Sequence, residues 1–332
     1  MYSKEQVRVS IIVPTYNHEK YIAQTIESIL KQKTSYGYEI LIGDDCSTDN
    51  TRRIIDEYKE QYPDIIRVFY HKKNVGATKN GYTLFKHSKG EYLAFCDGDD
   101  YWDDEYRLQR DIEFLEANFQ YTGVSGKVCP VDEDCIPLDE ATISKTKQFW
   151  NFSYDEFTLK DFENWEMPGH VSALTIRNFM KNSEHDYRIF YQAHDMVGDR
   201  TIVLLAVLSG NIICNSNIVS CYRYRDNGKE NFMSSFKAQN LYAQDYLMVR
   251  RLEHYSKKEF GIVVSADKVK KDRLVASVVR AMKSKSVGDI RVVTEILRYS
   301  GRPLLYLYYI AKIVILKNVY WHFCKDDRRV NL

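Results

Sequence analysis

The stretch Gly90-Glu-Tyr-Leu-Ala-Phe-Cys-Asp97-Gly-Asp99-Asp100 passes directly from apolar residues to three carboxylates. The apolar part has the length of one buried strand, and the carboxylates follow where that strand ends. Carboxylates this close repel one another, and they are stable only when they are solvated, capped or neutralised by cations. The stretch therefore predicts an inner strand whose carboxyl end borders a polar site.

Three further strands precede this one, each followed by a helical pattern. We predict strands at 9–13, 39–43 and 65–70, and helices at 21–33, from residue 48 onward and at 78–88. This alternation predicts an α/β fold with a mostly parallel, Rossmann-like sheet and flanking helices. In such sheets ligands bind beyond the carboxyl ends of the strands, where Asp44, Asp45 and the 97–100 carboxylates are expected.

The second half of the chain is less regular. We predict a helix after residue 102, a polar insertion at 130–168, a strand at 171–176, a buried helix at 202–208 and short strands at 212–214 and 218–222. Beyond residue 237 the pattern is helical and basic, with 19 Lys and Arg against 8 Asp and Glu from Arg250 to Leu332. We therefore expect a C-terminal helical extension whose charge differs from that of the rest of the chain.

The segment Pro303 to Phe323 is apolar and aromatic, with its basic residues gathered on one side of a helix. Such a helix either lies on an anionic membrane surface or packs on the rest of the protein. The sequence contains no run of about 20 apolar residues and no signal peptide before the first strand. Its seven cysteines follow no disulfide or zinc spacing. We expect a cytoplasmic protein, peripheral on the cytoplasmic face of the membrane if this segment binds lipid.

The carboxylates at 97–100 have the chemistry of a metal site. Hard divalent ions such as Mg²⁺ and Mn²⁺ take carboxylate oxygens and complete their shells with phosphate oxygens. On an extended strand end Asp97 and Asp99 would point the same way, and Gly98 would let a ligand approach the backbone. The structural alternative is an acidic loop that caps the next helix.

Polar residues follow the other strands as well. A carboxylate at Asp44 or Asp45 can accept an N–H of a nucleotide base, although residues 47–49 also suit a helix cap. Tyr16 can stack on a base or simply pack at the surface. Asn74 lies in the tight turn Asn74-Val-Gly76, where it is as readily structural as functional.

Four blocks occur in one order: Val9-Ser-Ile-Ile-Val-Pro-Thr-Tyr-Asn17, Asp44-Asp45-Cys-Ser-Thr-Asp49, Asn74-Val-Gly76, and the opening stretch from Gly90 to Asp100. Together they resemble the family 2 glycosyltransferases, closely over residues 7–125 and loosely to about residue 225. The resemblance implies the GT-A fold, a nucleotide-diphosphate sugar donor that is most commonly a UDP-sugar, a divalent metal (Mn²⁺ or Mg²⁺) and inversion at the anomeric carbon.

The resemblance also assigns roles by position. It puts Tyr16 and Asp44 or Asp45 at the base, Asp97 at the ribose or the metal, and Asp99 at the metal as its chief ligand. The remaining residues assigned to the nucleotide-sugar site are Pro14, Asn74, Lys79 and Gly98, with Lys79 expected near the base or the phosphates.

The block His194-Asp195-Met-Val-Gly198-Asp199 precedes the predicted buried helix. Family members commonly carry an acidic general base there, so we expect Asp199 to be the base, with Asp195 as its rival and helix capping as the structural alternative. Cys221-Tyr222-Arg223 resembles the Tyr-Arg that often follows in this family. His170 is more readily structural, and is otherwise a candidate for the acceptor site.

We expect a catalytic domain at 1–235, with a donor half at 7–125 and an acceptor half at 126–235, and a basic, helical C-terminal region at 236–332. The Gln-x-x-Arg-Trp of processive synthases is missing, which favours transfer of one sugar to a hydroxyl of a glycan or polyprenyl-linked acceptor, in cell-surface polysaccharide synthesis. The donor site alone would also suit a non-catalytic nucleotide-sugar-binding or scaffold protein.

Other protein classes fit the sequence less well. A sugar nucleotidylyltransferase needs a Gly-rich, basic loop after the first strand, and a phosphatase needs its aspartates there; the sequence has neither. The basic tail contains no nucleic-acid-binding module, so we expect no nucleic-acid partner.

Overall fold

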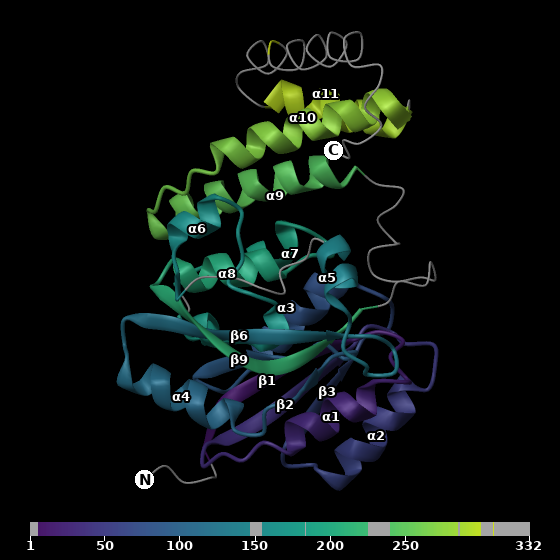
Figure 1. The fold of residues 1–332 in the computed structure, drawn as a ribbon, viewed down its shortest axis with the longest axis vertical. Helices are drawn as coiled ribbons and strands as arrows, with labels where there is room; N and C mark the ends of the chain where they lie inside the picture. Colours follow the sequence, from purple (N-terminus) through teal and green to yellow (C-terminus); the bar gives the residue numbers. More distant parts are fainter. Residues whose placement is uncertain are drawn as a thin grey trace. The chain divides into compact units, whose positions relative to one another are not determined.

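The computed structural model describes residues 6–146, 155–182, 184–224, 240–284, 286–299 and 308. The chain divides into two compact units, residues 1–227 with 251–264 and residues 228–250 with 265–332. The first unit is a sheet with helices on both faces (Figure 1), so the predicted α/β class is confirmed. The expected domain boundary after residue 235 remains a prediction.

Nine strands of the described chain form one sheet, in the order β3-β2-β1-β4-β8-β6-β9-β5, with β7 paired to β9. Their bounds are β1 Val7–Thr15, β2 Gly37–Asp44, β3 Ile66–Tyr70, β4 Tyr92–Phe95, β5 Tyr101–Trp102, β6 Tyr121–Val131, β7 Glu156–Phe157, β8 Leu174–Arg177 and β9 Asn211–Arg223. The first four strands pair in parallel, whereas β8 runs antiparallel to its neighbours β4 and β6. The carboxyl ends of β1 to β4 therefore meet at one edge, as the sequence predicts.

Helices cover both faces of this sheet (Figure 1). On one face lie α1 Ile22–Leu30, α2 Thr51–Gln61 and α4 Arg107–Ala117, and on the other lie α3 Ala77–His87, α7 Ile189–Gln192 and α8 Asp199–Val207. Alternate residues of β1, namely Val9, Ile11 and Val13, share a buried core with residues of α1 such as Ile22 and Ile26. A period of two on the strand and of about four on the helix puts these apolar side chains on facing surfaces.

The region after β5 differs in detail from the prediction. The polar insertion contains α5 Glu140–Thr146, β7 and α6 Leu159–Glu163. The strand expected at 171–176 begins as a 3₁₀ turn, Val171–Ala173, and a second such turn follows at Phe179–Lys181. The two short strands expected at 212–214 and 218–222 are one strand, β9, because residues 215–217 continue its backbone, although Asn215 is half-buried and Ser216 and Asn217 are exposed. Its partner β6 was not predicted, because small and polar residues interrupt its apolar pattern.

Where the structure describes it, the C-terminal part is helical, as predicted. Its elements are α9 Leu241–Tyr255, a π-helical turn at Ser256–Phe260, α10 Asp267–Ser284 and α11 Val287–Tyr299. Within the second unit, Ala243 and Tyr246 of α9 share a buried core with residues of α10 and α11. Apart from Tyr308, the predicted amphipathic segment at 303–323 lies outside the described residues. Among the described helices, none combines the length and apolar character that a membrane crossing needs.

Candidate functional site

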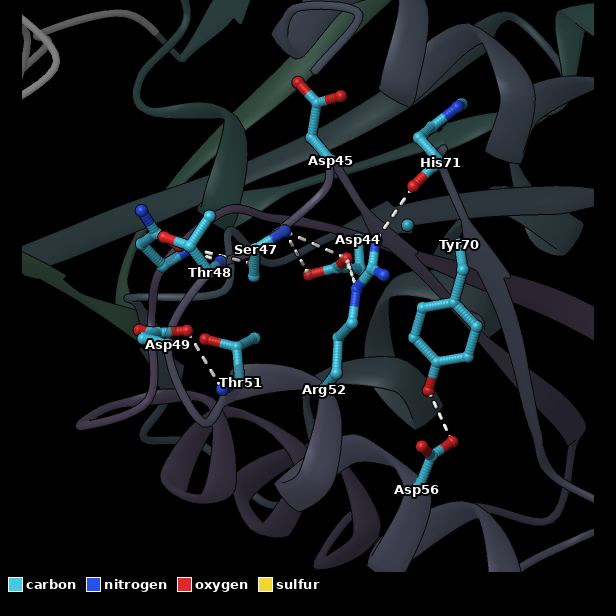
Figure 2. Close-up of polar contacts among 12 residues, drawn as sticks. Asp44, Asp45, Ser47, Thr48, Asp49, Thr51, Arg52, Asp56, Tyr70 and His71 are labelled. Carbon is cyan, nitrogen blue, oxygen red and sulfur yellow. Dashed lines mark hydrogen bonds and ion pairs between the residues drawn. The ribbon is translucent and has the colours of Figure 1, made fainter. Parts of the chain in front are cut away.

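The end of β2 carries Asp44, whose carboxylate is bound inside the protein (Figure 2). Asp44 is fully buried. Its carboxylate accepts hydrogen bonds from Arg52 Nε at 2.5 Å and from the Ser47 N–H at 3.1 Å. Arg52 also donates to the His71 carbonyl at 2.8 Å. Asp44 therefore ties the loop after β2 to the first turn of α2 and to the end of β3, which is a structural arrangement.

Asp45 extends away from this ion pair (Figure 2). Its two carboxylate oxygens accept the backbone N–H groups of Val75 at 2.7 Å and Gly76 at 2.9 Å. The Asn74 side chain accepts the same Gly76 N–H at 3.2 Å. Asp45 and Asn74 therefore fix the turn that leads from β3 into α3.

Two other residues assigned to the nucleotide site are open to solvent. Tyr16, directly after β1, is 43 % exposed. Lys79, in the first turn of α3, is exposed, and its Nζ lies 5.9 Å from the centre of the Tyr191 ring. Pro14 contributes through its backbone, since its carbonyl accepts the Gly98 N–H at 3.0 Å. An exposed ring and an exposed ammonium group at this edge suit a base and a phosphate.

The acidic stretch is a turn rather than an extended strand end. β4 ends at Phe95, and the Asp100 N–H bonds back to the Asp97 carbonyl at 2.9 Å. Strand alternation therefore stops before Asp97, so the extended strand end from which we predicted that Asp97 and Asp99 point the same way is not present. A Cβ on Gly98 would lie 2.6 Å from Thr15 Oγ1 and 2.9 Å from His18 Nδ1, so glycine lets this turn pack against the end of β1.

Three side chains gather around this turn. Asp97, Asp100 and His170 offer possible metal ligands within 4.8 Å of one another. The Asp99 carboxylate lies 3.7 Å from His18 Nε2, and its charge also acts to raise the pKa values of Asp97, Asp100 and His170. The structure thus brings Asp97 close to Asp100 and His170, to which the sequence analysis assigned no role in the metal site. The role of Asp99 as chief metal ligand stays a prediction.

The charges of this group are crowded. Burial, and then the neighbouring carboxylates of Asp100 and Asp199, raise the pKa of Asp97 well above its ordinary value. Burial and the nearby Asp99 raise the pKa of Asp100 in the same way, against the hydrogen bond from Ser172. Crowded carboxylates of this kind are stabilised by a proton or by a cation.

His170 is neutral at ordinary pH. Burial lowers its pKa to about 4. Its Nδ1 accepts the Ser172 N–H at 3.2 Å, and its ring meets the Tyr222 ring edge-on at 4.5 Å. These contacts connect the loop before β8 to the end of β9 beside the acidic turn.

Arg223, at the end of β9, binds the acidic turn formed by residues 97–100. Its Nε donates to the Asp99 carbonyl at 2.9 Å, and its backbone N–H donates to the Asp100 carboxylate at 3.1 Å. Its Nη2 donates to Gln24 of α1 at 2.6 Å, and the guanidinium carbon lies 4.5 Å from the centre of the Tyr21 ring. The Tyr-Arg pair is visible in the sequence, but the partners of Arg223, which are more than 100 positions away, are not.

Asp199 is the first residue of α8 and is half-buried. Burial raises its pKa, and the adjacent Arg200 opposes that shift. The charge of Asp199 also raises the pKa of Asp97 in the acidic turn. Asp195, its rival as base, is exposed, and its backbone carbonyl accepts the Thr78 hydroxyl.

Comparisons with known proteins support one family. The family model described as "Glycosyl transferase family 2" matches residues 10–186. The putative teichuronic acid biosynthesis glycosyltransferase TuaG of Bacillus subtilis is 37 % identical over 135 residues, which are 40 % of this chain and 51 % of TuaG. Poly(ribitol-phosphate) beta-N-acetylglucosaminyltransferase TarS of Staphylococcus aureus is 31 % identical over 169 residues, 47 % of this chain and 29 % of TarS. The chain therefore spans about half, or less, of the length of these curated relatives.

Solved structures have the same fold. The structure of S. aureus TarS 1–349 in complex with UDP-GlcNAc has a TM-score of 0.55 at 19 % identity, and the match covers 89 % of this chain and 92 % of that one. The mannosyltransferase PcManGT from Pyrobaculum calidifontis, in complex with GDP-Man and Mn²⁺, has a TM-score of 0.51 at 16 % identity, with coverage of 93 % and 86 %. At these identities the likeness shows the fold alone.

Proposed function

Because the chain belongs to glycosyl transferase family 2, we propose that it moves one sugar from a nucleotide-diphosphate donor to an acceptor hydroxyl, with inversion at the anomeric carbon. The observation that carries this proposal is that the charge of Asp199 acts on Asp97 of the acidic turn and raises its pKa. A transferase of this kind needs a base for the acceptor close to the groups that manage the departing diphosphate.

Asp199 is the proposed general base. The acceptor hydroxyl gives its proton to the Asp199 carboxylate as its oxygen attacks the anomeric carbon. The bond from that carbon to the diphosphate breaks on the opposite side, so the configuration inverts. Burial raises the pKa of Asp199 and so makes its carboxylate a stronger base than an exposed aspartate. Asp195 remains the rival, although its side chain is exposed.

The acidic turn fits a hard divalent cation such as Mn²⁺ or Mg²⁺. It presents clustered carboxylates whose pKa values burial and mutual repulsion raise, which is the donor set that such ions prefer. We propose Asp99 and Asp97 as the residues that hold the ion, with Asp100 and His170 adjacent. When bound, the cation would stabilise the negative charge of the departing diphosphate.

The nucleotide is proposed to bind along the ends of β1 and β2. Tyr16 offers an exposed ring for stacking, and Lys79 an ammonium group for the phosphates. Asp45 is a better candidate than Asp44 to accept a hydrogen bond from the base of the nucleotide, because the Asp44 carboxylate is bound by Arg52. We propose that Pro14, Asn74 and Gly98 shape the backbone around the nucleotide. A UDP-sugar is our first choice, in line with the ligand of the TarS structure.

The acceptor is proposed to be a glycan or polyprenyl-linked hydroxyl in cell-surface polysaccharide synthesis. The printed names of TuaG and TarS, which concern teichuronic acid and poly(ribitol-phosphate), support this choice. We further propose that the basic C-terminal region binds the cytoplasmic face of an anionic membrane, where a lipid-linked acceptor would be found. Flotation with anionic vesicles at low and high salt tests this; protein that ignores the vesicles at low salt would contradict it.

A donor screen tests the transferase proposal. The full chain is incubated with a panel of nucleotide sugars and Mn²⁺, and released nucleotide and transferred mass are followed by mass spectrometry. We expect one donor to be consumed by the wild type and not by Asp199→Asn. Nucleotide binding without turnover of any donor would favour the non-catalytic binding protein.

A further inference from the structure

The loop between α7 and α8 carries Asp195 and ends at Asp199, and α3 holds it in place. Thr78, in the first turn of α3, is buried, and its hydroxyl donates to the Asp195 carbonyl at 2.6 Å. Thr78 is separated from Asp195 by 117 positions, so this bond joins two distant parts of the chain. It is a side-chain bond to the loop of the proposed base.

The start of α3 is also fixed by Asp45, a residue of the proposed nucleotide site. The carboxylate of Asp45 binds the N–H groups of Val75 and Gly76, immediately before α3 begins. Gly76 has a φ of +91°, and a Cβ there would lie 3.2 Å from the Asp195 carbonyl. Glycine therefore provides both the backbone conformation and the space that let the Asp195 loop approach.

A second contact between α3 and this loop involves an aromatic ring. The Phe190 ring of α7 lies between two glycines: a Cβ on Gly81 would be 3.1 Å from it, and a Cβ on Gly198 would be 2.7 Å from it. The ring also meets Phe85 of α3 edge-on at 4.6 Å. Gly198 directly precedes Asp199, so the packing reaches the residue next to the proposed base.

The loop itself is short and internally bonded. The His194 Nδ1 accepts the N–H groups of Met196 and Val197 at 3.0 and 3.1 Å. The Gly198 carbonyl accepts the Thr201 N–H at 2.9 Å at the start of α8. These bonds constrain the backbone on both sides of Val197, so we expect an anchor at Asp195 to influence the position of Asp199.

We propose that Thr78 is a positioning residue for the base, which fixes the Asp195 carbonyl so that the Asp199 carboxylate points at the acceptor hydroxyl. This rests on the proposed role of Asp199. Thr78 is buried, and in this proposal it acts through its bond to the loop rather than by contact with donor or acceptor. A displacement of the base by about 1 Å costs roughly a hundredfold in rate, so one hydrogen bond at this place has a measurable effect on turnover.

The test compares Thr78→Val, which removes the hydroxyl and keeps the shape, with Thr78→Ser, which keeps the hydroxyl. Thr122→Val is the matched control, because Thr122 is also buried and its hydroxyl bonds to the backbone carbonyls of Gly210 and Asn211, in the β6–β9 part of the sheet. We expect Thr78→Val to lower kcat by about ten- to a hundredfold with KM for the donor and nucleotide affinity within about twofold of wild type. Thr78→Ser should recover most of kcat, and Thr122→Val should keep it.

Three outcomes would overturn the proposal. In the first, Thr78→Val turns over as fast as wild type while Asp199→Asn is inactive. Asp199 would then keep its role as general base, and Thr78 would not be a positioning residue. In the second, Thr78→Val loses nucleotide affinity instead of kcat, which makes Thr78 a donor-site residue. In the third, Thr78→Val and Thr122→Val lose the same activity and the same thermal stability, which makes the bond only structural. Activity retained by Asp199→Asn would count against the proposed function itself.

Discussion

The ends of β2 and β4 both carry neighbouring aspartates, yet their surroundings differ. At the end of β2, Asp44 is paired with Arg52, and Asp45 is bound by two backbone N–H groups. At the end of β4, burial and neighbouring carboxylates raise the pKa of Asp97 and that of Asp100, and the donors that reach Asp100 do not reverse that shift. At the first strand end Arg52 pairs directly with the buried carboxylate of Asp44, whereas at the second the charge of Arg223 does not offset burial and the neighbouring carboxylates.

This difference separates two uses of the same residue type. A carboxylate with a full set of internal donors stabilises the fold and has little capacity left for a ligand. A carboxylate group with surplus negative charge costs stability until a cation or a proton neutralises it. Asp44 is therefore expected to matter mainly for stability, and the β4 end mainly for binding and turnover.

The largest effect is expected for Asp99→Asn. Removal of the proposed chief metal ligand should abolish Mn²⁺-dependent nucleotide binding and lower turnover by roughly 10⁴-fold, because several kcal/mol of charge stabilisation are lost. Calorimetry with the nucleotide found in the donor screen measures this, with thermal melting to verify the fold. Asp103→Asn, an exposed carboxylate four positions on, is the matched control. Unchanged nucleotide affinity in Asp99→Asn would remove the metal site from the β4 end.

Asp199→Asn should have the next largest effect and a different pattern. A positioned carboxylate base contributes about 10²–10⁴-fold to turnover, so kcat should fall by that factor. Donor and metal affinity should survive, because this residue belongs to α8 and not to the acidic turn. Steady-state kinetics beside calorimetry distinguishes the two patterns. If Asp195→Asn loses turnover and Asp199→Asn keeps it, the base is Asp195.

Asp44→Asn should affect stability more than catalysis. The substitution leaves the Arg52 guanidinium without its buried acceptor charge, at a cost of about 1–3 kcal/mol. Urea unfolding of the metal-free protein measures it, and Asp99→Asn in the same assay should lose little or gain, because it relieves repulsion. If Asp44→Asn is as stable as wild type but binds the nucleotide more weakly, Asp44 instead contacts the base of the nucleotide.

Local sequence pattern was sufficient to predict the donor half of the fold. β1 to β4 and the helices between them are each specified by apolar periodicity within a short window, and their parallel pairing follows from the alternation. The sequence pattern did not predict β6, and it predicted β9 as two short strands, because the pairing of these two strands is long-range: Cys129 lies beside Cys221 in the sheet. Small and polar residues are tolerated in these strands because neighbouring strands complete the hydrogen bonds.

The site was predictable as a set of residue types but not as a set of contacts. Sequence order identified Asp44, Asp97 and Asp199 as candidates, because carboxylates at strand ends and helix starts are visible locally. It could not tell that Asp44 would be neutralised by Arg52, or that Asp97 would meet His170. Such partners depend on which segments the fold brings together, and that information is absent from any single window.

The smallest effect is expected for Arg200→Gln, and it concerns pH. The base must be ionised, so turnover falls as pH drops through the pKa of Asp199; burial raises that pKa and the charge of Arg200 lowers it. Removing the charge should therefore move the acid limb of the kcat profile to higher pH, measured at saturating Mn²⁺. Arg200 also stacks on Trp165 at 4.1 Å and donates to its carbonyl at 2.7 Å, so Arg200→Lys is the control that keeps the charge and loses the stacking. If both variants move the limb equally, the contact with Trp165 matters and the charge does not; if neither does, Asp199 is not the titrating base.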